Sequence, residues 1–107
     1  MDAVEAFASL MPALQEVIKE LREMSDEKLR EVGKKLGEER ITLLKYTLVM
    51  LGDEEEEIKG MGVPRLLRRL VFKYDELTDE DKARIVAKQL ELESNKKALS
   101  QQPAGQA

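Results

Sequence analysis

The 107-residue sequence contains no cysteine and no histidine. Without cysteine the chain can form no disulfide, no thiol nucleophile, no cysteine-ligated zinc site and no iron–sulfur cluster. Without histidine it lacks the commonest general base, the commonest transition-metal ligand and the usual pH switch. The run Asp53 to Glu57 supplies carboxylates, but it lacks the alternating ligands and central glycine of an EF-hand loop. We therefore expect no catalytic residue, no cofactor and no metal site, and we predict that the protein is not an enzyme.

Aromatic residues are scarce, at 4% of the chain, and long hydrophobic runs are absent. Aliphatic side chains and methionine must therefore fill the core, which suits packed helices better than a sheet. The longest apolar stretch, residues 41–51, is interrupted by Lys45 and is shorter than the roughly 20 residues of a membrane span. Asp2 and Glu5 lie where a signal peptide would have a basic region followed by a continuous apolar segment, which argues against a signal peptide. We expect a cytoplasmic protein without membrane association, and its many Lys and Glu residues also resemble those of thermophilic proteins.

The hydrophobic pattern predicts an all-α protein, a compact bundle of four or five helices. Its length suits one domain, residues 1–99, and the polar segment 100–107 is expected to be a disordered tail. Apolar residues recur every three or four positions from Val4 to Leu21, the spacing of one helix face. Pro12 is best tolerated in a first helical turn, so Ser9 is expected to cap that helix. The predicted helices are 9–24, 26–37, 38–51, 64–76 and 79–99.

Local signals place several of these boundaries. Ser25 and Thr78 each precede acidic residues and are expected to cap helices, and Pro64 suits a first helical position. Gly33 and Gly37 lie four residues apart, where another helix could approach closely, although we favour Gly37 as a helix end. The segment 38–51 is apolar on nearly all sides and should be the central and most buried helix.

Residues 52–62 are predicted to form a flexible acidic loop, because three glycines flank the acidic run there. This loop also divides the charge. Residues 1–60 carry 15 acidic and 9 basic residues, whereas residues 61–107 carry 7 acidic and 9 basic residues. The two parts of the chain are therefore expected to attract each other.

One helix face carries the candidate site. At 100° per residue, Leu66, Leu67 and Leu70 fall on one side of helix 64–76 and the basic residues fall on the other. Exposed aromatic and arginine side chains are enriched at the centres of protein interfaces. The predicted partner-binding residues are Arg65, Arg68, Arg69, Phe72 and Lys73. The alternative is that these arginines pair internally with the acidic loop, through Asp53, Glu54, Glu55, Glu56 and Glu57.

Two further functions remain open from the sequence. The same basic face could bind the phosphates of a nucleic acid, although an overall charge of -4 argues against it. The last helix has one apolar face formed by Ala83, Val86, Ala87 and Leu90. It also has a separate line, Ile85, Leu92 and Leu99, which needs a partner either within the bundle or in a homodimer. We predict a protein interaction or regulatory module that binds another protein or itself, with nucleic-acid binding and structural self-assembly as alternatives.

Overall fold

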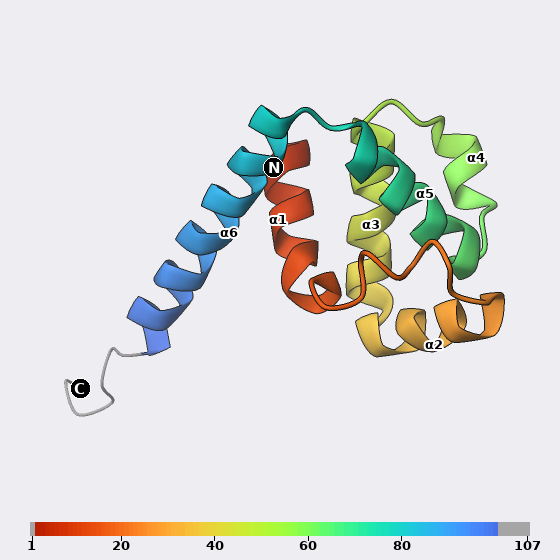
Figure 1. The fold of residues 1–107 in the computed structure, drawn as a ribbon, viewed down its shortest axis with the longest axis horizontal. Coiled ribbons are helices and arrows are strands. Elements are labelled where there is room, and N and C mark those ends of the chain that lie inside the picture. Colours follow the sequence, from red (N-terminus) through yellow and green to blue (C-terminus); the bar gives the residue numbers. More distant parts are fainter. Residues whose placement is uncertain (1, 101–107) are drawn as a thin grey trace.

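The computed structural model describes residues 2–100, with side chains described as far as residue 95. Over these residues the chain forms six α-helices and no strand, which confirms the predicted all-α bundle (Figure 1). No helix in this part of the chain has both the length and the apolar character needed to cross a membrane. The predicted tail beyond Ser100 lies outside the described residues. The helices are α1 (Ala3–Leu14), α2 (Asp26–Leu36), α3 (Glu38–Met50), α4 (Glu55–Lys59), α5 (Val63–Glu76) and α6 (Asp79–Ser100).

The first helix differs from the prediction. The Asp2 carboxylate accepts a hydrogen bond from the Glu5 amide at 2.8 Å and caps α1, and the helix runs past Ser9 without a break. Pro12 lies in the last turn of α1, where it has no amide to donate to the Ala8 carbonyl of the preceding turn. The chain then continues as turns over residues 15–23. The predicted helix 9–24 is therefore wrong, although the turns still bury Ile18 and Leu21 as the apolar spacing requires.

The expected caps and the two glycines shape the middle of the chain. The hydroxyls of Ser25 and Thr78 accept hydrogen bonds from amides three residues later, at 3.2 and 3.1 Å, as predicted. Gly37 has a φ of 84° and ends α2, which only glycine does without strain. Gly33 is buried, and a Cβ added there would overlap the side chain of Val63. Gly33 therefore allows the start of α5 to approach α2 closely.

Helix α3 occupies the centre of the bundle, where it packs against α1, α2, α4 and α5. Leu44, Thr47 and Leu48 are buried, and the Thr47 hydroxyl donates to the Leu43 carbonyl at 2.7 Å. Tyr46 on another face is 47% exposed. The predicted central position is confirmed, but α3 is not the most buried helix. Six residues of α1 are buried, whereas only three residues of α3 are buried, because α3 exposes one side to solvent.

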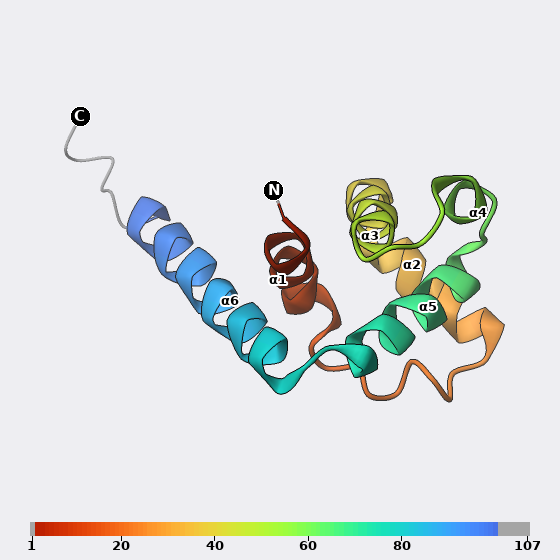
Figure 2. The same cartoon turned by 90° about the horizontal axis from the view of Figure 1, so that it is seen from above.

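Helix α6 packs mainly against α1 and extends beyond the other helices (Figures 1 and 2). Ile85 is 2% exposed and belongs to the core, so this residue of the predicted second line packs within the bundle. Leu92 is 36% exposed, and the side chain of Leu99 lies outside the described part of the helix. Val86 and Leu90, on the other predicted face, are 52% and 61% exposed. The apolar face that the bundle leaves open is thus that of Val86 and Leu90.

Candidate interaction surface

Helix α5 separates apolar and basic side chains as its spacing predicts. Leu66, Leu67, Leu70 and Val71 are buried in the core, and Pro64 stands in the first turn. The five candidate residues lie on the remaining circumference of the helix, and their surroundings divide them into three groups.

Arg69 and Lys73 form the first group, because both pair with Asp53. The Arg69 side chain donates to the two Asp53 carboxylate oxygens at 3.0 Å from Nε and 2.6 Å from Nη2. Lys73 Nζ lies 3.4 Å from the same carboxylate, whose side chain is only 7% exposed. The hydrogen bond from Arg69 holds the pKa of Asp53 below its usual range, with the charge of Lys73 adding to this effect and desolvation opposing it. Asp53 therefore stays ionised and ties α5 to the end of α3.

A glycine turn brings Asp53 to this position. Gly52 has a φ of 109°, and its amide donates to the Val49 carbonyl at 3.0 Å. The Asp53 amide donates to the Leu48 carbonyl at 3.1 Å, so the turn closes the end of α3. The expected loop 52–62 then contains the short helix α4, which the sequence analysis missed. A glycine directly after an apolar helix was the available signal for this turn.

Arg68 has partners of a weaker kind. Its Nη1 atom lies 2.5 Å from an Asp26 carboxylate oxygen, and its Nη2 atom donates to the Met24 carbonyl at 3.1 Å. The Arg68 and Asp26 side chains are 42% and 56% exposed. Ion pairs this exposed contribute about 0 to 1 kcal/mol, so a carboxylate on a binding partner could replace Asp26 at little cost.

Phe72 and Arg65 form the part of the face that the fold leaves open. Phe72 is 49% exposed, and the Arg69 guanidinium carbon lies 5.1 Å from its ring centroid. This cation–π contact orients the ring. Arg65 is exposed and forms no ion pair with any residue whose side chain is described. Together they border a surface hollow of about 360 Å³, whose lining residues are Glu57, Met61, Arg65, Arg68, Arg69 and Phe72.

The expected internal pairing of the basic face is present in part, and partner binding by this face stays a prediction. Asp53 is the one residue of the acidic run that pairs with the basic face, and Glu55 pairs instead with Lys59 at 3.5 Å. Phe72 is not covered by a neighbouring helix. Met61 and Glu57 complete the hollow; Glu57 was expected there as part of the acidic run, whereas no signal in the sequence pointed to Met61. Among the described side chains, no three carboxylates come together as they would around a metal ion.

The chain was compared with protein-family models, with curated proteins and with solved structures. None of the three comparisons found a match. The functional argument therefore rests on the geometry of these surfaces.

Proposed function

We propose that this protein is a non-enzymatic interaction module that binds another protein through Arg65, Arg68 and Phe72 of α5. The observation that carries the proposal is Phe72, which is 49% exposed at the edge of a hollow bordered by arginines. Binding a partner would remove this ring from water, and arginine and aromatic residues are enriched among those that dominate binding energy.

The ion pairs support assigning Arg65 and Arg68, rather than Arg69 and Lys73, to the partner. Arg69 donates two hydrogen bonds to a shielded carboxylate, and charge-assisted pairs of this geometry are the stronger kind. Arg69 and Lys73 therefore position the helix and support Phe72. Arg65 forms no ion pair with a described side chain, and the ion pair of Arg68 is exposed, so these two arginines can bind a carboxylate of the partner.

These residues also define the chemistry of the partner. The hollow offers apolar surface from Phe72 and Met61 beside the charges of Arg65 and Arg68. A matching surface presents an apolar side chain with one or two carboxylates next to it. A charge of this sign on the partner also speeds its association with the basic face.

Nucleic-acid binding through the same face is supported less well. Two of the four basic side chains are already held by Asp53, which leaves Arg65 and Arg68 for phosphates. Affinity for nucleic acid grows with the number of phosphates neutralised, and two contacts give little. Asp79, Glu80 and Asp81 at the start of α6 would repel the backbone of any nucleic acid that followed the two helices.

The proposal can be tested by photo-crosslinking in the cells that produce the protein. A photo-reactive phenylalanine analogue replaces Phe72, and in the control chain it replaces Tyr46, an equally exposed aromatic residue on α3. We expect an adduct with a distinct protein from position 72 only, and we expect Arg65→Glu to remove it. The same adducts from both positions would refute the proposal, and an adduct with nucleic acid would favour the alternative.

A further inference from the structure

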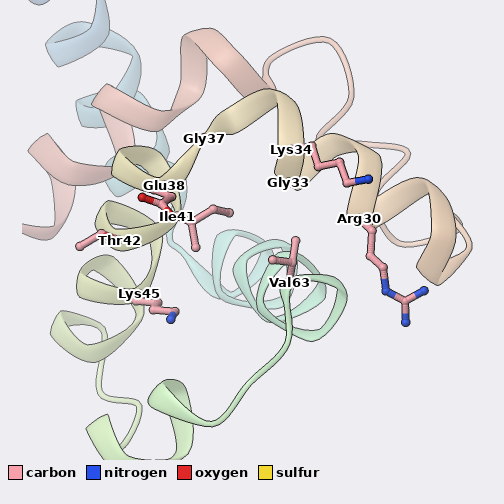
Figure 3. Close-up of a pocket in the computed structure, with 9 residues that line it drawn as sticks. All are labelled: Arg30, Gly33, Lys34, Gly37, Glu38, Ile41, Thr42, Lys45 and Val63. Carbon is pink, nitrogen blue, oxygen red and sulfur yellow. The ribbon is translucent and has the colours of Figure 1, made fainter.

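A second surface feature lies between α2 and α3, away from the α5 face. It is a groove of about 650 Å³ whose apolar floor is formed by Gly33, Ile41 and Val63. Figure 3 shows Ile41 and Val63 at its centre, with Arg30 and Lys34 on α2 to one side and Lys45 on α3 to the other. The close contact of Gly33 with Val63 shapes this floor.

The groove carries unpaired positive charge. Arg30, Lys34 and Lys45 form no ion pair with any described side chain, and Glu38 is the one carboxylate among the lining residues. The whole chain has a net charge of -4, so the groove is a local excess of cations, as is the basic face of α5. A segment that fills the groove should therefore be apolar in its middle and acidic at its edges.

One side of helix α6 has that chemistry over the segment from Val86 to Glu93. Val86 and Leu90 are 52% and 61% exposed, and Glu93 follows one turn later on the same side of the helix. Glu91 lies on the other flank of Leu90, and its one ion pair with a described side chain is an exposed contact with Lys88 at 3.4 Å. This side is turned roughly 80 to 140° away from Ile85, which packs into the core.

The helix cannot reach the groove of its own chain. Helix α1 lies between α6 and α3 and packs against both (Figure 1). The last turns of α6 extend beyond α1, and residues 90–95 are all exposed. These turns are therefore open to another molecule.

We propose that α6 of one copy docks into the α2–α3 groove of a second copy. Val86 and Leu90 lie on Ile41 and Val63, and Glu91 and Glu93 pair with Arg30, Lys34 and Lys45. Because the two surfaces of this contact differ, a pair of copies retains one free groove, on the first copy, and one free helix, on the second. Such heterologous contacts extend into a chain of subunits or close into a ring. The contact area of one helix face is small, so association depends on protein concentration and weakens with added salt.

A charge exchange tests this contact. The groove variant is Lys34→Glu with Lys45→Glu, and the helix variant is Glu91→Lys with Glu93→Lys. Light scattering after size-exclusion chromatography measures the mass of each from micromolar to several hundred micromolar protein, and circular dichroism checks that each variant keeps its helices. We expect the unmodified protein to assemble, each variant alone to remain monomeric, and both the mixture and the chain with all four substitutions to assemble again.

The control separates docking from general attraction between oppositely charged proteins. The double variant Lys19→Glu with Lys28→Glu has the same net charge as the groove variant but changes exposed residues outside the groove. We expect it to assemble alone as the unmodified protein does, and Arg65→Glu to have no effect, which keeps this contact distinct from the α5 site. An unmodified protein that stays monomeric throughout, a groove variant that assembles normally on its own, or four substitutions that fail to restore assembly would each overturn the proposal.

Discussion

Arg69 and Asp53 join two parts of the chain that lie sixteen residues apart. Two hydrogen bonds of 3.0 and 2.6 Å connect the guanidinium on α5 with the carboxylate that follows α3. The carboxylate is largely shielded from water, and Lys73 approaches it from the next turn of α5. Arg69 and Lys73, at the centre of the predicted basic face, therefore connect α5 to the end of α3 through Asp53. Arg65 and Phe72, at its edges, remain exposed.

Asp53→Ala should lower the free energy of unfolding by about 1 to 3 kcal/mol, because it removes the carboxylate that Arg69 and Lys73 share and leaves Lys73 only the longer contact with Glu76 at 3.9 Å. Urea denaturation followed by circular dichroism measures the change. The matched control is Glu54→Ala at the neighbouring exposed residue, which should change stability by less than about 0.5 kcal/mol. Equal effects of the two substitutions would show that the Asp53 ion pairs add nothing.

The same contact predicts how stability depends on pH. The folded state lowers the pKa of Asp53, so its contribution is complete above the usual aspartate pKa of about 3.9. That contribution is lost as the pH falls from there through the lowered value. The stability difference between the native chain and Asp53→Asn should therefore stay constant from neutral pH down to the usual pKa and shrink below it. Urea titrations at a series of pH values measure this difference, and a constant difference at all acidic pH values would contradict the assignment.

Ile85 and Leu92 should respond differently to truncation although both belong to one apolar line. Ile85→Ala removes a core side chain and should cost about 2 to 5 kcal/mol. Leu92→Ala affects a partly exposed side chain at the extending part of α6 and should cost less than about 1 kcal/mol. Thermal unfolding of dilute protein measures both without self-association. A larger loss from Leu92 than from Ile85 would mean that α6 packs on α1 through other residues.

The effect of Gly33→Ala on the free energy of unfolding should depend on the residue at position 63 and should change sign when Val63 is replaced. In the native chain the added methyl overlaps Val63, and overpacking of this kind costs about 1 to 3 kcal/mol. In a Val63→Ala background the overlap is relieved, and the higher helix propensity of alanine should stabilise α2 by up to about 1 kcal/mol. Denaturation of the four chains of this double-mutant cycle gives both values. A stabilising effect in the native chain would show that α5 does not need the close approach.

Local signals in the sequence predicted much of the fold. Ser25, Thr78 and Pro64 act within one helical turn, so their positions alone placed the starts of α2, α6 and α5. Pro12 was misplaced because proline favours the first turn of a helix, whereas α1 holds it in the last turn, where core packing of the helix offsets the lost hydrogen bond.

The candidate site was predictable only in part. The spacing of α5 gave its basic face, but which bases pair internally depends on where Gly52 directs Asp53, a relation between distant segments. The choice between Ile85 and Val86 for the core likewise depends on the position of α1, because both residues lie on apolar lines of the same helix. The spacing of apolar residues identifies the apolar faces of a helix, but it does not show which other helix each face packs against.

The most direct test of the central claim measures the affinity of the α5 face for the protein that crosslinks to position 72. Titration calorimetry compares the native chain with Phe72→Ala, Arg65→Glu and the charge-matched surface variant Lys19→Glu. We predict that Phe72→Ala and Arg65→Glu each weaken binding about tenfold or more, as loss of a central interface residue does, while Lys19→Glu leaves it nearly unchanged. Unaltered affinity in both α5 variants, with their stability intact, would contradict the account.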